Sequence, residues 1–266
     1  MRIPFTKAHG ARNDFLLSWH EQAAVPDYAA AARAICDRHT GVGADGWLLV
    51  GQEAGLPWIR LLNSDGSEAE ISGNGTRCAA AFLIDAGVSG AEVSIRTGAG
   101  VKRLRLLERS GPRFLFEMNM GRPKVAPERL RYRLELSAGV ADATILDVGN
   151  PQCAVFVEGF EFDWRAMGAE IERHPLFPNR TNVSFVRVVD RHTLEVRFFE
   201  RGAGETMSSG TGSTGAMAAA VLRGAAESPV TVLTPAGRLE LRWESGEIYL
   251  TGPAEIVATG EFLFQE

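Results

Sequence analysis

Apolar and polar residues alternate in two short segments, each just ahead of a Gly-containing turn. Val93–Thr97 and Val230–Leu233 show the two-residue period of half-exposed strands. An Ala-rich apolar run precedes each of them, at Thr76–Ile84 and Ala216–Leu222, and predicts a helix. Gly87 is expected to close the first of these helices.

Further patterns add strands and two more helices. The additional strands are predicted at Arg103–Leu107, Arg113–Met118, Thr144–Val148, Ala154–Val157, Val183–Val186 and Leu194–Phe199. The additional helices are predicted at Ala29–Cys36 and Trp164–Glu172. Many strands with few helices predict an α+β fold of two mixed domains, each with a sheet wrapped around one central helix.

The chain contains an internal repeat with a constant offset. Residues 68–100 align without a gap to residues 205–237, an offset of 137, and 11 of the 33 positions are identical. The shared pattern is Glu, a spacer, Ser-Gly-x-Gly, an Ala-rich run, a Gly, and a strand ending in Ala-Gly. The same offset maps Asn13 onto Asn150 and Asn63 onto Glu200. We interpret this as a duplication that gives two similar halves.

The duplicated Ser-Gly-x-Gly segments, Ser72–Gly75 and Ser209–Gly212, each precede a predicted helix. Small residues allow the free N–H groups of a helix start to approach a ligand, and the helix dipole favours an anion there. If the halves face each other, both helix starts could hold one small anionic ligand between Ser72 and Ser209. The alternative is that both segments are tight turns in which Ser caps a helix.

Composition and charge argue against several classes of protein. The 266 residues carry 28 basic and 33 acidic side chains, a net charge of -5, which argues against nucleic-acid binding through bulk charge. The chain has no apolar run of ~18 residues and no signal-peptide core, so we expect a cytoplasmic protein that does not enter membranes. The three cysteines form no CxxC pair and the histidines have no ligand spacing, so we expect no disulfide framework and no metal site.

Two enzyme alternatives remain open on the residues alone. Gly210, Gly212 and Gly215 match GxGxxG formally, but only a weak strand precedes them, so a dinucleotide site is disfavoured. A Ser-His-Asp hydrolase is not excluded, although neither Ser lies in a GxSxG elbow. Arg77 and Arg201 are candidate partners for an anion, and Glu200 for a cation; the alternative for each is a solvated surface position.

Taken together, the motifs resemble those of the diaminopimelate epimerase family, a branch of the cofactor-independent, two-base amino-acid racemases. The resemblance covers almost the whole chain. It is carried by His9–Phe15, Gly41–Asp45, Asn63–Glu68, Gly73–Cys78, Gly149–Pro151, His174–Pro178, Thr181–Val183, Glu200–Thr206 and Gly210–Gly212.

The resemblance implies a fold of two pseudo-symmetric α/β domains with the active site in the cleft between them. The expected boundaries are residues 1–117, joined by a C-terminal strand at 252–266, and residues 118–251. Family members remove the α-proton of an amino acid with one cysteine and return a proton to the other face with a second. The implied substrate-binding residues are Asn13, Asn63, Gly73, Asn74, Asn150, Asn182, Glu200, Arg201, Gly210 and Thr211.

The departures from the family pattern fall on the acid/base groups. Ser72 and Ser209 stand where the family has its two catalytic cysteines, and Gln152 stands where a His usually follows Asn-Pro. A thiol has a pKa near ~8.5, whereas a serine hydroxyl is a weak base unless another group activates it. Cys78 matches a family cysteine outside the catalytic pair, and Cys36 and Cys153 are not catalytic by this alignment.

Three hypotheses follow. The leading one is an isomerase acting on the α-carbon of diaminopimelate or a similar amino acid, a lysine and peptidoglycan precursor, with Ser72 and Ser209 in the catalytic positions. The second is another isomerisation or a dehydration on the same scaffold. The third is an amino-acid binding protein without turnover. The only partner predicted is the small-molecule substrate, with no nucleic acid and no membrane, and a homodimer is left open.

Overall fold

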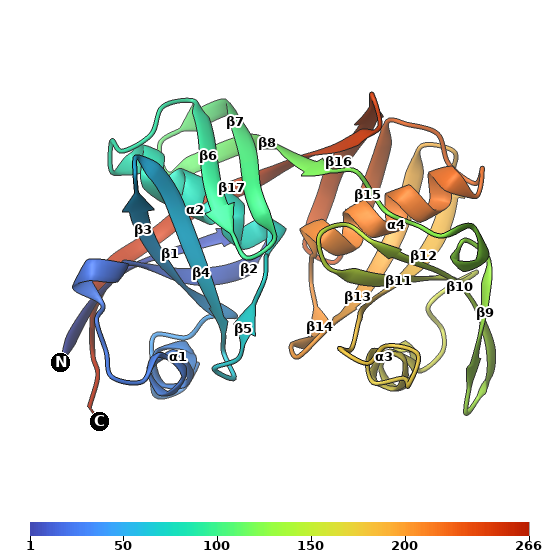
Figure 1. The fold of residues 1–266 in the computed structure, drawn as a ribbon, viewed down its shortest axis with the longest axis horizontal. Helices are drawn as coiled ribbons and strands as arrows, with labels where there is room; N and C mark the ends of the chain where they lie inside the picture. Colours follow the sequence, from blue (N-terminus) through green and yellow to red (C-terminus); the bar gives the residue numbers. More distant parts are fainter. Residues whose placement is uncertain (266) are drawn as a thin grey trace. The chain divides into compact units, whose positions relative to one another are not determined.

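The computed structural model describes residues 1–265, and the chain divides into two compact units. One unit contains Met1–Met118 together with the chain from Gly252 on, and the other contains Asn119–Thr251 (Figure 1). Two long strands, β8 (Arg113–Gly121) and β17 (Glu247–Leu263), contain residues of both units. The backbone therefore passes from one unit to the other twice.

The first unit is a closed sheet around one helix. Its strands pair in the order β17–β1–β2–β3–β4–β6–β7–β8, and β8 pairs with β17 in turn. The elements are β1 (Arg2–Gly10), β2 (Asn13–Trp19), η1 (His20–Gln22), α1 (Tyr28–Cys36), β3 (Gly46–Glu53), β4 (Leu56–Asn63), β5 (Glu68–Ala69), α2 (Gly73–Asp85), β6 (Glu92–Thr97) and β7 (Gly100–Ser110).

The second unit repeats this order. Its strands pair as β9–β10–β11–β12–β13–β15–β16–β17, with β14 beside β13. The elements are η2 (Pro127–Arg129), β9 (Tyr132–Leu136), β10 (Gly139–Asp147), β11 (Pro151–Phe156), α3 (Trp164–Glu172), β12 (Asn182–Asp190), β13 (Thr193–Glu200), β14 (Gly204–Thr206), α4 (Gly210–Leu222), β15 (Val230–Thr234) and β16 (Gly237–Glu244).

The offset of 137 extends over the whole fold. It maps β1 onto β10, β4 onto β13 and α2 onto α4 with identical bounds. The pairing repeats as well, since β2–β3 and β11–β12 are both parallel and β3–β4 and β12–β13 are both antiparallel. The predicted α+β fold of two similar mixed units is thereby confirmed.

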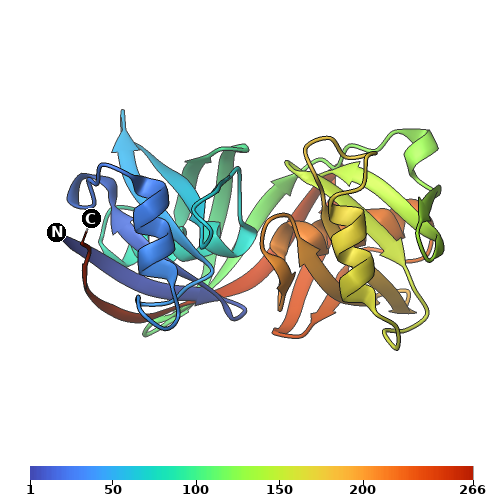
Figure 2. The same cartoon turned by 90° about the horizontal axis from the view of Figure 1, so that it is seen from below.

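The central helices are buried on all sides, which explains their composition. Ala79–Ala81 in α2 and Ala216, Ala218–Ala220 in α4 have no exposed surface. Such a helix needs small apolar residues around its whole circumference, because strands approach it from every direction. The outer helices α1 and α3 are amphipathic and lie on the outside of their sheets (Figure 2). Asp27 and Asp163 cap them by accepting backbone N–H bonds.

One expectation needs correction, and it concerns where the central helices begin. The predicted helices begin three or more residues earlier than Thr76 and Ala216, because the Gly-containing segments form the first helical turns. The structure supports the prediction that Gly210–Gly215 is not a dinucleotide site, because β14 is antiparallel to β13 whereas β15 is parallel to it. β14, α4 and β15 therefore form no parallel βαβ unit.

Candidate active-site residues and family membership

Each central helix starts at a capping serine. Ser72 Oγ accepts the N–H of Gly75 at 3.1 Å, and Ser209 Oγ accepts the N–H of Gly212 at 3.1 Å. Both serines are extended in backbone, as N-cap residues are. The capping alternative is therefore realised, and it leaves other N–H groups of each first turn available to an anion.

Ser209 is paired with a carboxylate. Its Oγ donates to Glu200 Oε2 at 2.8 Å, and Thr206 Oγ1 donates to Glu200 Oε1 at 2.7 Å. Glu200 ends β13, and Thr206 belongs to β14, the short strand that pairs with it. Ser209 is almost fully buried at 3% exposure. A hydroxyl bonded to a carboxylate has a proton acceptor at hand, which is what a serine base requires.

The first unit has an amide, and not a carboxylate, at the position that matches Glu200. The offset puts Asn63 where the other unit has Glu200. Asn63 Nδ2 donates to Ser67 Oγ at 3.0 Å, beyond the end of β4. An amide cannot take up a proton as a carboxylate can. The groups around Ser72 and Ser209 are therefore alike in backbone and unlike in acid/base capacity.

A chain of side-chain hydrogen bonds runs beside the first turn of α2 in the first unit. Asn13 Nδ2 donates to Asp45 Oδ2 at 2.7 Å, and Asn74 Nδ2 donates to Asn13 Oδ1 at 3.1 Å. Arg77 Nη2 donates to Asn74 Oδ1. The chain thus joins a carboxylate to a guanidinium through two amides.

The second unit has a neutral chain at the matching place. Gln152 Nε2 donates to Asn150 Oδ1 at 2.7 Å, and Asn150 Nδ2 donates to Thr211 Oγ1 at 3.3 Å. Gln152 Oε1 is buried and has no hydrogen-bond partner in the described part of the chain. Such an oxygen is costly to bury, and it can accept a donor from a bound molecule or water.

Asn182 and Arg201 meet in the second unit. Asn182 Oδ1 accepts the backbone N–H of Arg201 at 3.1 Å, and Asn182 Nδ2 donates to Pro151 O at 3.0 Å. Arg201 Nη1 donates to Asn179 O at 3.3 Å. Asn182 therefore holds the start of the turn that follows Glu200.

The structure gathers the sequence-predicted residues into one group per unit. Asn13 and Asn74 join Ser72 and Gly73 in the first unit, with Asn63 at the end of β4. The second group contains Asn150, Asn182, Glu200, Arg201, Ser209, Gly210 and Thr211.

Two further residues were missed as site residues. Asp45 orients Asn13, and Thr206 holds Glu200. Both lie in the family motifs, but their sequence positions carry no sign of these contacts.

The three cysteine thiols are buried and free, and take no part in either group. Burial raises the pKa of Cys36, Cys78 and Cys153 to about 12 in each case. Over the described residues no histidine bonds to Ser72 or Ser209, so the hydrolase pairing is not formed. Residues 1–265 also contain no cluster of three metal-ligating side chains.

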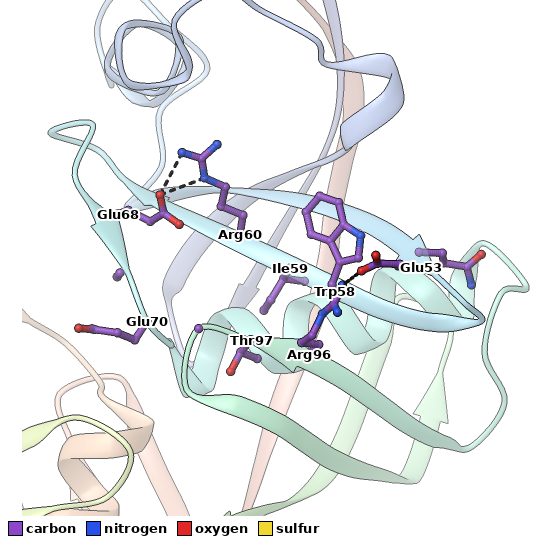
Figure 3. A pocket seen from close by; sticks show the side chains of 11 residues that line it. Glu53, Trp58, Ile59, Arg60, Glu68, Glu70, Arg96 and Thr97 are labelled. Carbon is purple, nitrogen blue, oxygen red and sulfur yellow. Dashed lines mark hydrogen bonds and ion pairs between the residues drawn. The ribbon is translucent and has the colours of Figure 1, made fainter.

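The first unit also has a cavity of about 730 Å³ (Figure 3). Trp58 and two ion pairs line it, Arg60 with Glu68 at 3.0 Å and Arg96 with Glu53. It contains none of the residues of the two groups. The cavity is therefore lined by a separate set of side chains.

Comparison with known proteins settles the family. The family model described as "Diaminopimelate epimerase" matches residues 5–126 and 144–257. A diaminopimelate epimerase of Pelotomaculum thermopropionicum is 39% identical over 98% of this chain and 99% of its own. One from Synechococcus sp. (strain JA-3-3Ab) is 40% identical over 97% of this chain and 98% of its own.

The chain belongs to the diaminopimelate epimerase family. Both capped turns lie inside the matched ranges.

Solved structures agree with this family's fold. A hydroxyproline epimerase from Agrobacterium vitis superposes with a TM-score of 0.74 at 14% identity, over 98% of this chain and 90% of the other. A Bacillus anthracis protein of the PhzF family gives 0.71 at 16% identity, over 99% and 100%. These likenesses concern the fold alone. In residues 1–265, no helix has the length and apolar character needed to cross a membrane.

Proposed function

We propose that this protein is an amino-acid epimerase that acts on the α-carbon of diaminopimelate or a close analogue. The observation that carries the proposal is the 2.8 Å hydrogen bond from Ser209 to Glu200 at the start of α4. It gives the serine in a cysteine position the proton acceptor it needs. Membership of the diaminopimelate epimerase family and the asparagines around both capped turns support the choice of substrate.

Binding would use the two capped turns on one substrate. First-turn N–H groups at Gly73, Asn74, Gly210 and Thr211 are suited to a carboxylate, because they carry the positive end of the helix dipole. The side chains of Asn13, Asn63, Asn150 and Asn182 would orient the amino acid, and Glu200 would attract its ammonium group. No cofactor is needed for this binding scheme.

Proton transfer would start at Ser209. As its Oγ takes the α-proton, its own hydroxyl proton passes to Glu200, so the substrate is left as the carbanion and Glu200 as the neutral acid. The first-turn N–H groups stabilise the charge that spreads onto the carboxylate. Ser72 would then give its proton to the opposite face of the carbanion, which inverts the centre.

The second proton transfer, from Ser72 to the carbanion, is expected to be the slower one. Ser72 becomes an alkoxide when it gives up its proton, and Asn63 cannot accept or supply a proton in the way Glu200 does. Return of the proton from Glu200 to the original face is therefore easier than inversion. We expect α-proton exchange with retention to outrun epimerisation.

The same asymmetry favours one alternative, an amino-acid binding protein without turnover. If neither serine supports proton removal, the first-turn N–H groups of each central helix would still be available to an anion. Binding would then raise the free energy of unfolding, and with it the melting temperature, as the ratio of ligand concentration to Kd increases.

The test incubates the protein with LL-diaminopimelate in D₂O and follows loss of the α-proton signal by NMR and formation of the meso isomer. Exchange that disappears in the Ser209→Ala variant supports the epimerase. Thermal stabilisation by LL-diaminopimelate without exchange supports the binding alternative. Absence of exchange and stabilisation together rejects both.

A further inference from the structure

Arg77 is a fully buried cation in the second turn of α2. Its guanidinium donates to Pro253 O at 3.0 Å, to Gly73 O at 3.3 Å and to Asn74 Oδ1. Burial lowers its pKa to about 10, so the group remains charged at neutral pH. The adjacent Cys78 thiol supplies no counter-charge, because burial raises its pKa to about 12.

No carboxylate balances this charge among residues 1–265. The carboxylates on neighbouring elements have other cationic partners: Asp45 pairs with Arg38 at 2.8 Å, and Glu255 with Arg113 at 3.3 Å. The acceptors of Arg77 are two backbone carbonyls and an amide oxygen. The start of α2 therefore holds one uncompensated positive charge, which is strongly unfavourable away from water.

Two glycines leave space for the Arg77 side chain, and the second unit forms the same fold without an arginine at the matching position. A Cβ at Gly252 would lie 2.9 Å from Arg77 Cζ, and one at Gly10 would lie 3.3 Å from Nη2. The matching position in α4 is Thr214, whose hydroxyl donates to Gly210 O at 2.8 Å. The duplicate thus builds the same sheet and helix around a neutral residue. The fold itself therefore does not require a positive charge at Arg77.

Arg77 also fixes the orientation of the amides beside it. A guanidinium only donates, so the oxygen of Asn74 must face Arg77 and its NH₂ must face Asn13. Asp45, an acceptor at the other end, holds the NH₂ of Asn13. Neutral side chains at both ends would leave each amide free to turn over. The charged ends therefore set a single hydrogen-bond direction through Asn13 and Asn74.

We propose that Arg77 is a positioning residue for a substrate carboxylate at the first turn of α2. Its charge and the orientation it imposes on Asn74 prepare Ser72–Gly75 for an anion, and the bound carboxylate supplies the missing negative charge. This inference rests on the proposed function, since it assumes an amino-acid ligand at that turn. It assigns the stronger carboxylate preference to the first unit, because Thr214 gives α4 no such charge.

The test measures the Kd of LL-diaminopimelate and of its diamide by isothermal titration calorimetry. In the diamide an uncharged amide replaces each carboxylate. Arg77→Gln should raise the Kd of the diacid about tenfold or more and change that of the diamide less than about twofold. Arg77→Lys keeps the charge and should recover much of the preference for the diacid. The control is Arg223→Gln, which removes a similarly buried arginine paired with Asp142 at the far end of α4.

A structural role alone would lower the melting temperature of Arg77→Gln and leave the diacid-to-diamide ratio as in wild type, which would overturn the inference. If neither Arg77 variant folds, Asn74→Asp places a carboxylate against the guanidinium in nearly the same volume. That variant should fold and lose its preference for the diacid; a retained preference counts against the role of Arg77. If wild type binds neither compound, the proposed function fails, and this inference with it.

Discussion

Glu200→Gln is the substitution that tests the proposed base most directly. It removes the charge while keeping the size of the side chain. In the native unit two hydroxyls donate to the two carboxylate oxygens, Ser209 at 2.8 Å and Thr206 at 2.7 Å. Glutamine has one acceptor oxygen, so one of these hydroxyls must turn away or meet an N–H donor.

The size of the effect follows from these contacts. A hydrogen bond to a charged group contributes about 1.5–3 kcal/mol, so losing one should lower the free energy of unfolding by about 2 kcal/mol. That corresponds to a fall in melting temperature of about 4–8 °C for a chain of this size. A positioned general base contributes about 10²–10⁴-fold to a proton transfer. We therefore expect α-proton exchange to slow by about 100-fold or more.

The assay is deuterium incorporation at the α-carbon of LL-diaminopimelate, measured by NMR beside a thermal melt. Thr206→Val is the matched control, because it removes the other hydroxyl from Glu200 and leaves the carboxylate against Ser209. It should lose comparable stability and keep exchange within about threefold of wild type.

A double-mutant cycle completes the test. If Ser209 and Glu200 act as one unit, Glu200→Gln should cost little once Ser209→Ala is present. Exchange by Glu200→Gln within about threefold of wild type would refute the pairing. So would strictly additive losses in the double variant.

Three other outcomes follow from the structure. Replacing Ser72 by Cys should speed epimerisation more than replacing Ser209 by Cys. Among residues 1–265 no carboxylate bonds to Ser72 as Glu200 does to Ser209, and a thiol at a helix start is more acidic than a hydroxyl. Chiral analysis of the product measures which variant is faster. Gly212→Ala should have a clearly lower melting temperature than Gly75→Ala. A Cβ at Gly212 would lie 2.8 Å from Phe198 Cδ1, whereas a Cβ at Gly75 would lie 3.3 Å from its nearest neighbouring side chain. Overpacking of this kind costs about 1–3 kcal/mol. All three thiols should resist alkylation in the native protein at pH 8 and react after unfolding, because burial holds their pKa at about 12; a fast-reacting thiol would contradict this.

The duplication is visible in the sequence because the offset is uninterrupted. The helices at Ala29–Cys36 and Trp164–Glu172 were predicted to within one residue, because their amphipathic patterns and capping aspartates are local signals. The strands of the first 63 residues were missed. β3 is an example: Gly46–Gly51 is buried on both faces, since the sheet lies between α1 and α2. A strand covered on both sides does not alternate.

The family motifs identified the candidate residues but not their contacts. Asn13 meets Asn74, and Asn150 meets Thr211, across 61 residues in both cases. Strand pairing and the packing of the central helix against the strands bring these residues together. No local sequence pattern indicates these contacts. Gln152 was recognised as a departure in sequence; its buried, unpartnered oxygen became visible only in the fold.

The sequence by itself indicated that the two halves are similar, that serine stands at both positions where the family has its catalytic cysteines, and that the chain resembles a known family. Only the tertiary structure showed which of these residues are in contact. Glu200 reaches Ser209 because β14 turns the chain back beside β13, whereas Asn63 stands at the matching place. Arg77 is uncompensated because burial and the partners of nearby carboxylates fix its surroundings. Charge balance depends on distance and access to water, and a linear sequence contains neither.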